Sequence, residues 1–287
     1  MIYLILSVTA SICIFVVFKL LKKLKVNTFQ TIVINYGIAF GFGILSVQKP
    51  ITIHSILNSD WFLGSIIVGA LFIGLFTMMA WTAQKNGLSV ASVASKMSVI
   101  IPIIFGVILF HESIAYQKII GIVLAFMAVY LVSAKSKTTI NFKKNLMLPL
   151  ALFLGSGLSD TYINYLQQTS ISDEDIPLFS ACVFGFAGII GMLIISVKRM
   201  HNQLQWDPRS IPGGVILGLA NYASLYYIIK ALQSPNMESS TFFTLNNVAI
   251  VMISTLIGLW FFKEHLTKRN WTGIGLALIA IYLVTFA

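Results

Sequence analysis

The chain has 287 residues, of which 57% are hydrophobic and 10% are charged, and its formal net charge is +10. Soluble domains are roughly 45–50% apolar and about 25% charged, so this composition excludes a water-soluble protein. A basic excess would suggest a nucleic-acid partner for a soluble protein, but here most basic residues flank hydrophobic segments, where they act as topology signals. No nucleic-acid partner is therefore expected.

Ten hydrophobic segments are long enough to cross a bilayer, whose core of about 30 Å needs roughly 20 apolar residues per helix. They cover residues 2–20, 29–47, 61–83, 89–110 and 116–134, and then 146–168, 176–197, 210–231, 239–262 and 270–286. Lipid cannot hydrogen-bond an open backbone, so continuously apolar segments of this length must be helices. The predicted fold is an all-α integral membrane protein with ten transmembrane helices and short loops. The first segment follows no basic residue, so we expect it to be retained as a helix and not cleaved as a signal.

The basic residues are distributed unevenly between alternate loops. The loops after odd-numbered segments hold 15 of them: Lys19, Lys22, Lys23, Lys25, Lys85, Lys135, Lys137, Lys143, Lys144, Lys198, Arg199, Arg209, Lys263, Lys268 and Arg269. The other loops hold three: Lys49, Lys118 and Lys230. The positive-inside rule therefore places both termini outside the cytoplasm, across a bacterial inner membrane.

The two halves of the chain repeat one another at a spacing of 152 residues. Eleven positions from Gly106 to Val132 recur from Gly258 to Val284, among them Phe110, Glu112, Gly121 and Tyr130 as Phe262, Glu264, Gly273 and Tyr282. This indicates two five-helix repeats, at residues 1–138 and 139–287. Because five is odd, the second repeat enters the membrane inverted, as in many secondary transporters.

Each repeat ends in a turn with Glu, Phe110-His111-Glu112 and Phe262-Lys263-Glu264, followed by a Gly/Ala-rich helix. With the duplicated five-helix unit, this resembles the drug/metabolite transporter superfamily, EamA type, over almost the full chain. The family usually has Gly before that Glu, where this chain has His111 and Lys263. The resemblance implies a secondary transporter whose first four helices in each half surround a central cavity. It also implies cytoplasmic termini, against the charge distribution, which we follow here.

Two ionisable residues lie within predicted spans, Lys96 in the fourth and Asp160 in the sixth. Each costs about 2.5 to 3.5 kcal/mol on insertion scales, so each needs a reason to be there. At about 1.5 Å per residue, neither is expected in the last turn of its span. One interpretation is structural, with Lys96 reaching an interface and Asp160 bonded to neighbouring hydroxyls. The other places both in a polar cavity, where Lys96 binds an anionic group and Asp160 binds an amine or carries a proton.

Other polar residues on the presumed cavity helices complete the candidate solute-binding set: Asn35, Tyr36, Trp81, Gln84, Tyr162, Asn164, Asn221, Tyr222, Asn246 and Asn247. About half of such residues are expected only to join helix to helix. The mixture of amides and aromatic rings suits a small amphipathic solute, with an amino acid as the favoured example.

Several further residues are given structural roles. Pro102 is expected to interrupt the fourth helix beyond Lys96. Glu112 and Glu264 are interpreted as carboxylates at the N-termini of the fifth and tenth helices, and the acidic residues before Pro177 as a cap for the seventh. Glycine pairs Gly37/Gly41 and Gly214/Gly218 are expected at close helix contacts.

The sequence therefore predicts a secondary transporter of a small organic metabolite. A lipid-linked sugar or polyprenyl-phosphate flippase and a passive channel remain as alternatives. An enzyme is not expected, because the four histidines lie in loops without clustered ligands. Cys13 and Cys182 lie in separate apolar segments, so no disulfide, metal or other cofactor is predicted. The expected partners are the solute and membrane lipid, and the sequence leaves a monomer or a homodimer open.

Overall fold

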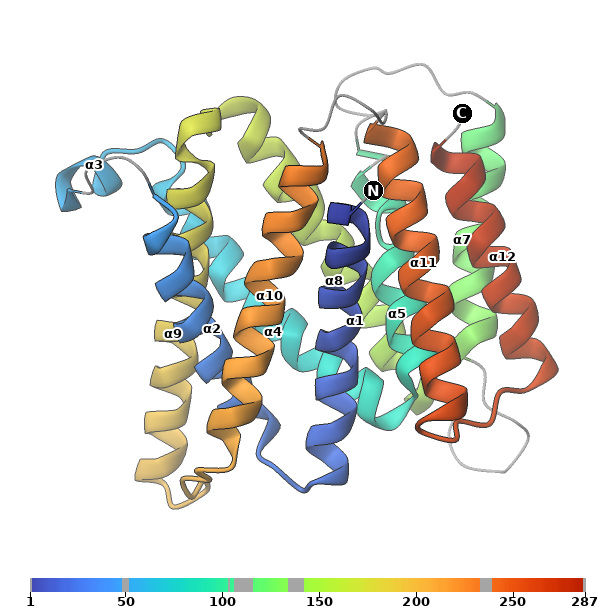
Figure 1. Cartoon of the computed structure of the whole chain (residues 1–287), viewed down its shortest axis with the longest axis horizontal. Coiled ribbons are helices and arrows are strands. Elements are labelled where there is room, and N and C mark those ends of the chain that lie inside the picture. Colours follow the sequence, from blue (N-terminus) through green and yellow to red (C-terminus); the bar gives the residue numbers. More distant parts are fainter. Residues whose placement is uncertain are drawn as a thin grey trace. The chain divides into compact units, whose positions relative to one another are not determined.

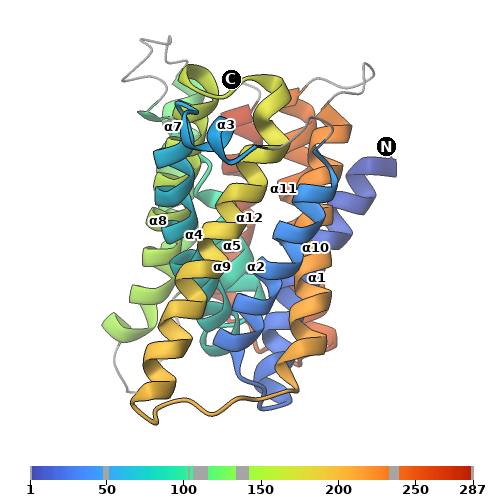
Figure 2. The same ribbon diagram turned by 90° about the vertical axis from the view of Figure 1, so that its left-hand side faces the viewer.

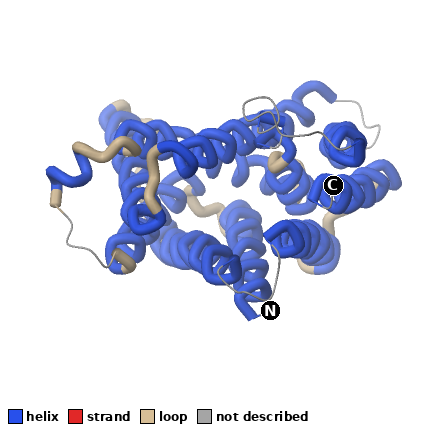
Figure 3. Tube along the Cα trace, turned by 90° about the horizontal axis from the view of Figure 1, so that it is seen from above, coloured by secondary structure: helices blue, strands red, loops and turns tan. Residues whose placement is uncertain are grey.

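The computed structural model describes residues 2–47, 52–102, 104–105, 116–133, 142–232 and 239–285. All regular structure in these ranges is helical (Figure 3). The helices are α1 (Ile2–Lys23), α2 (Thr28–Leu45), α3 (Ile53–Leu57), α4 (Phe62–Lys85), α5 (Leu88–Met97), α7 (Tyr116–Ser133), α8 (Phe142–Thr169), η1 (Asp173–Asp175), α9 (Ile176–Met200), α10 (Ser210–Leu232), α11 (Ser239–Trp260) and α12 (Lys268–Thr285).

Among the described residues, five helices are long and apolar enough to cross a membrane: Ile2–Lys23, Thr28–Leu45, Phe62–Lys85, Leu146–Gln167 and Ile176–Met200. Shorter apolar helices cover Leu88–Pro102, Ile119–Val132 and Leu245–Trp260. The chain is an integral membrane protein, and a described helix occupies at least part of each predicted span. The five-residue helix α3 was not predicted, because it lies in a loop and is too short to give an apolar pattern.

The fourth predicted span is interrupted within its described residues. Helix α5 stops at Met97, a turn follows, and helical geometry returns at Ile100–Pro102 and at residues 104–105. A proline ring clashes with the carbonyl four residues earlier and lacks an N–H, which accounts for the interruption near Ser98. The prediction that Lys96 avoids the last turn of its span stays a prediction, because residues of the span beyond the interruption are again helical. Lys96 lies in the last turn of α5, directly before the interruption. There its charge complements the negative end of the helix dipole.

The chain divides into two compact units that both draw on the two halves of the sequence. Unit 1 consists of Met1–Lys19, Met78–Leu158 and Ala223–Ala287, and unit 2 of Leu20–Thr77 and Ser159–Tyr222. Helices α1, α4, α8 and α10 each contribute to both units.

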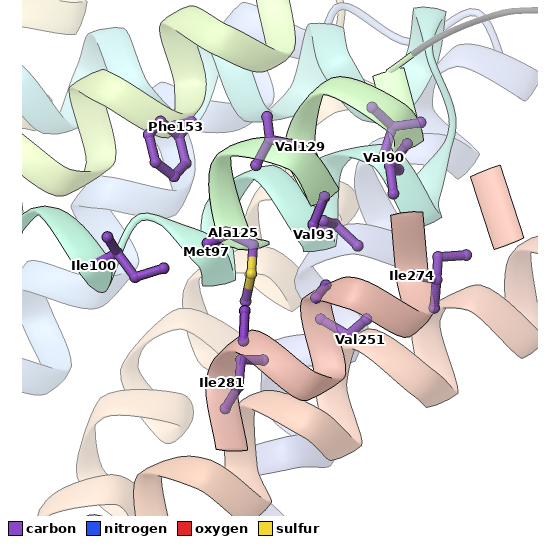
Figure 4. Packing of buried hydrophobic residues seen from close by; sticks show 14 of the residues in the cluster. Val90, Val93, Met97, Ile100, Ala125, Val129, Phe153, Val251, Ile274 and Ile281 are labelled. Carbon is purple, nitrogen blue, oxygen red and sulfur yellow. The ribbon is translucent and has the colours of Figure 1, made fainter. Parts of the chain in front are cut away.

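Unit 1 is built around an apolar cluster in which α5, α7, α8, α11 and α12 meet (Figure 4). Val93 and Met97 of α5 are fully buried, as are Phe153 of α8 and Ala277 of α12. Helices α7 and α12 run side by side (Figure 1). A Cβ on Gly273 would lie 2.7 Å from the Val132 backbone nitrogen, so glycine permits this approach.

Unit 2 packs α2 against α9 (Figure 2), with small residues at the contact. A Cβ on Gly43 would lie 3.0 Å from the Ala181 Cβ, for example. Gly214 and Gly218 of α10 contact α2 closely, as predicted. The prediction was wrong for Gly37 and Gly41, since a Cβ at either position would meet nothing within 4 Å.

Candidate functional site

The polar residues of unit 1 form a seam along α5 and α11. The Ser254 hydroxyl donates to the Ser92 hydroxyl at 2.7 Å, and both side chains are fully buried. Lys96 follows Ser92 by one turn, so the two residues share a face of α5. Lys96 itself is half-buried. The seam therefore brings a cation close to the buried hydroxyl pair.

Two adjacent asparagines extend this seam on α11. The Ser7 hydroxyl of α1 donates to Asn246 Oδ1 at 3.1 Å, and Asn246 is 1% exposed. Asn247 is 8% exposed, and its side chain makes no hydrogen bond within the part of the chain that the structure describes. Asn247 and Ser254 are two turns apart and share one face of α11. Asn247 is therefore the amide of this seam that is left available to hydrogen-bond a ligand.

Gln84 and Trp81 lie on the part of α4 that belongs to unit 1. The Gln84 amide donates to the Phe18 carbonyl at 2.9 Å, which joins α4 to α1. The Trp81 ring is 45% exposed and lies 5.4 Å from the Lys85 ammonium, a cation–π contact. Gln84 thus has a structural partner, whereas nearly half of the Trp81 surface is exposed.

Three of the predicted residues, Asn35, Asn221 and Tyr222, form hydrogen bonds between α2 and α10 in unit 2. Asn221 Nδ2 donates to Asn35 Oδ1 at 3.3 Å, and both residues are buried. Ser46, the C-cap residue of α2, follows about three turns beyond Asn35. Its hydroxyl shares a hydrogen bond with the Tyr222 hydroxyl of α10. The α2 and α10 helices are therefore linked by two polar contacts inside unit 2.

Tyr36 is fully enclosed in an aromatic group of unit 2. Its hydroxyl donates to the Phe72 carbonyl at 2.7 Å, and its ring lies 5.5 Å from Phe76 and 6.2 Å from Phe184. None of its surface is exposed. In this structure the tyrosine joins α2 to α4, and its predicted contact with a solute remains a prediction.

The predicted residues of α8 lie on different faces. Asp160 and Asn164 are exposed and one turn apart, whereas Tyr162 is half-buried against the apolar cluster around Trp61. Asp160 belongs to unit 2 and Lys96 to unit 1. Next to Asp160, the buried Ser159 hydroxyl has no hydrogen-bond partner among the described residues.

Glu264 has a role that the sequence analysis assigned incorrectly. Its Oε1 accepts from the Lys19 ammonium at 2.7 Å and from the Leu88 backbone N–H at 2.8 Å. The carboxylate therefore caps α5, and the interpretation that it serves the N-terminus of α12 was wrong. That terminus is capped by Thr267 and Asn270, which bond to each other. Glu112 lies outside the described residues.

The acidic segment before α9 also behaves differently from the prediction. Asp175 occupies the N-cap position but makes no capping hydrogen bond, because its Oδ2 accepts from the Ser172 hydroxyl at 2.8 Å. Pro177 lies in the first turn as expected. Across the described ranges, no three His, Cys, Asp or Glu side chains gather as metal ligands.

Sequence reasoning missed the serines of unit 1, Ser7, Ser92 and Ser254. Ser92 lies one turn from Lys96 and Ser254 two turns from Asn247, and this spacing was the available signal for these two serines. Ser7 lies on a helix without a predicted site residue, so no such signal existed for it. Small hydroxyls are common in membrane helices, however, so composition alone did not distinguish these three from packing residues.

Apolar helices that carry buried amides, hydroxyls and an ammonium define a polytopic membrane protein of the carrier or channel class. The pattern of the EamA-like transporter family matches residues 1–134 and 147–286, and the chain belongs to this family. This confirms the family resemblance and establishes a membrane transporter of small solutes.

Relatives from three organisms illustrate the family. A protein of Haemophilus influenzae, described as uncharacterized, is 28% identical over 99% of this chain and 97% of its own length. An uncharacterized transporter of Archaeoglobus fulgidus is 28% identical over 68% of this chain and 67% of its own. A probable glucose uptake protein of Bacillus anthracis, GlcU, is 25% identical over 85% of each chain. One crystal structure shares the fold with a TM-score of 0.58, at 12% identity, and covers 98% of this chain and 96% of its own.

Proposed function

We propose that the protein is a secondary carrier that moves a small organic solute by alternating access, with ten helices in two inverted repeats around a central cavity. The observation that carries the proposal is the pair of family matches, 1–134 and 147–286. Each has the length of one five-helix unit, and the gap between them contains the boundary at 138/139 predicted from the internal repeat. Inverted repeats of this kind give a carrier two related states, each open to one side of the membrane.

We assign the solute contacts first to Asn247 and Lys96 in unit 1. The Asn247 side chain has no hydrogen bond to give up among the described residues, so a solute that hydrogen-bonds its amide displaces no protein contact. The exposed ring of Trp81 and the remaining amides and hydroxyls of the candidate set supply the apolar and polar contacts that small-molecule sites combine.

An amino acid is one solute class that fits these groups. Lys96 would bind its carboxylate, and Asp160 would bind its amine or carry a coupled proton. A hexose is the second class. It is favoured by the relatives named as probable glucose uptake proteins and by the neutral amide and hydroxyl groups, which match the donors and acceptors of sugar hydroxyls.

Two measurements on purified protein test the solute class and the transport mechanism. The thermal midpoint is followed with glucose, other hexoses and neutral amino acids, because a ligand that binds only the folded state raises it. Counterflow of labelled solute into proteoliposomes then distinguishes a carrier from a channel, since only a carrier accumulates label by exchange. Absence of counterflow with every solute that stabilises the protein would overturn the carrier mechanism.

Asn247→Leu tests the assigned site with Asn246→Leu as its control. Removing the unpaired Asn247 amide is expected to leave the midpoint of the empty protein unchanged or higher, while abolishing the shift caused by solute. The control is expected to lower the midpoint, because it breaks the bond with Ser7. An undiminished solute shift in Asn247→Leu would remove this residue from the site.

Asp160→Asn tests proton coupling separately from solute binding. We expect uptake driven by a pH gradient to be lost and counterflow exchange to persist, because exchange needs no net proton movement. Unchanged gradient-driven uptake would exclude Asp160 as the coupling group.

A further inference from the structure

One pocket in unit 2 is lined by none of the residues proposed to contact the solute. It has a volume of about 340 Å³ and is formed by the loop from α1 to α2 and the loop from α9 to α10. Its lining residues are Lys25, Val26, Asn27, Gln205, Trp206, Asp207 and Arg209.

Hydrogen bonds hold these two loops together. Gln30, which is fully buried, donates through Nε2 to the Gln205 carbonyl at 2.7 Å and accepts from the Asp207 N–H at 2.8 Å. The Asn27 N–H donates to Asp207 Oδ2 at 3.3 Å, and the Ser210 hydroxyl donates to the Asn27 carbonyl at 3.2 Å. The pocket therefore has a fixed frame made from both loops.

The charges that line the pocket sum to one positive charge. Asp207 Oδ1 accepts from Arg209 Nε at 2.9 Å, and Arg209 holds the pKa of this carboxyl below its usual value, so the two charges offset each other. The Lys25 ammonium forms no ion pair or hydrogen bond with any described residue. The pocket thus offers one uncompensated ammonium.

The other groups on the pocket wall are mainly donors. Arg209 has five N–H donors, and Asp207 takes two of its side-chain nitrogens, which leaves donors for a ligand. The side-chain amides of Asn27 and Gln205 and the indole N–H of Trp206 add further donors. A single negative charge surrounded by several acceptor oxygens, which is the chemistry of a phosphodiester, matches this wall.

The surroundings of the pocket suit the membrane interface. Lys22, Lys23, Lys198 and Arg199 lie in the last turns of α1 and α9, at the ends from which the two loops leave. Leu24, Met200 and Trp206 are 61%, 84% and 52% exposed, so large apolar side chains also remain uncovered there. Basic residues beside exposed aromatic and aliphatic groups are typical of helix ends that contact anionic lipid headgroups.

We propose that this pocket binds the phosphate of an anionic phospholipid headgroup, with Lys25 and Arg209 as its charged ligands. The shared chemistry is a phosphate group, which a headgroup or free phosphate could supply. The exposed apolar residues around the pocket favour the headgroup, because they provide contacts for the acyl region that free phosphate does not use.

The backbone at Lys25 gives the proposal a sharp test. Lys25 has φ 53°, in the left-handed region that favours glycine, directly after α1. Lys25→Gly therefore removes the ammonium while keeping a residue suited to this backbone. Lys263 has φ 52° after α11 in unit 1, so Lys263→Gly makes the same chemical and conformational change away from the pocket. Lys25→Arg keeps the charge and serves as the rescue variant.

The experiment measures the thermal midpoint of full-length protein in nanodiscs of phosphatidylcholine with increasing phosphatidylglycerol. We expect a saturable rise for the wild type, Lys263→Gly and Lys25→Arg. Lys25→Gly removes one cation near an anionic lipid surface. We therefore expect the phosphatidylglycerol fraction that gives half of the maximal rise to be about fivefold higher for this variant. A parallel series adds sodium phosphate to pure phosphatidylcholine discs, with sodium chloride at matched ionic strength.

The outcomes separate a specific site from general attraction. Equal midpoint rises of Lys25→Gly and Lys263→Gly, or no rise in any of the proteins, would overturn the proposal that this pocket binds a headgroup phosphate. A Lys25-dependent rise with sodium phosphate that equals the rise with lipid would support the phosphate chemistry but refute the headgroup as its source. A Lys25-dependent rise with phosphatidylglycerol alone supports the full proposal.

Discussion

The ion pair between Glu264 and Lys19 gives the strongest stability prediction for unit 1. The two side chains are 10% and 19% exposed, and their charged atoms are 2.7 Å apart. Glu264→Ala leaves a largely buried Lys19 ammonium that keeps its hydrogen bond to the Ala83 carbonyl at 3.2 Å, and it removes the acceptor of the Leu88 N–H. Removing one partner of a buried pair costs about 3–5 kcal/mol, and we expect about 3 because Lys19 keeps a carbonyl. Glu264→Gln retains an acceptor for Leu88 and should cost about 1–2 kcal/mol.

The thermal midpoint in detergent measures both effects. At about 2–4 °C per kcal/mol for a chain of this size, Glu264→Ala should lower the midpoint by about 6–12 °C. Asp60→Ala, which removes an exposed carboxylate from a loop, is the control and should change stability by less than about 0.5 kcal/mol. A double-mutant cycle with Lys19→Met should show a coupling of about 1.5–3 kcal/mol. A coupling near zero would refute the pair as a source of stability.

Three further variants test other parts of the structure by the same thermal measurement. Gly87→Ala should lower the free energy of unfolding by about 1–3 kcal/mol, because φ is 121° there and a Cβ would lie 2.8 Å from Glu264 Oε2. The control is Gly74→Ala in α4, where a Cβ would meet nothing within 4 Å, and it should lower the midpoint little. Tyr36→Phe should cost about 1 kcal/mol by removing a buried hydroxyl bond, and a changed half-saturation concentration for uptake would show that solute also reaches this residue. Asp207→Asn should reduce the dependence of the thermal midpoint on pH in acid. The hydrogen bond from Arg209 lowers the pKa of Asp207 in the folded protein. The stabilisation by the charged Asp207 is therefore present above the unfolded pKa of about 3.9, and it disappears as the pH falls through the folded pKa. Identical midpoints of wild type and Asp207→Asn between about pH 3 and pH 6 would contradict this.

The positions of the membrane helices could be predicted because lipid permits so few backbone structures. Residues 29–47 were predicted and α2 covers Thr28–Leu45, while 176–197 were predicted and α9 covers Ile176–Met200. The extra turn of α9 includes Lys198 and Arg199, which a hydropathy pattern assigns to the loop although the backbone stays helical. Helix ends at the interface are therefore less predictable than helix centres.

The contacts of the polar residues could not be predicted in the same way. In a soluble helix the apolar stripe identifies the buried face, but in a membrane helix both the lipid face and the packed face are apolar. Asn246 and Asn247 look equivalent in the sequence, yet one bonds Ser7 and the other has no partner among the described residues. The distinction depends on which helix lies opposite each amide, and that information is tertiary.

Glu264 shows how a local interpretation fails for a long-range contact. A carboxylate a few residues before a helix usually serves that helix, but here the acceptor of the Leu88 N–H comes from 176 residues further along the chain. The apolar cluster of unit 1 likewise combines Val93 and Ala125 from the first half with Val251 and Ile281 from the second. The two halves of the sequence and the two compact units are thus different divisions of the same chain. Because the cap and the core of unit 1 both need residues from the two halves, a change in the turn after α11 acts directly on α5.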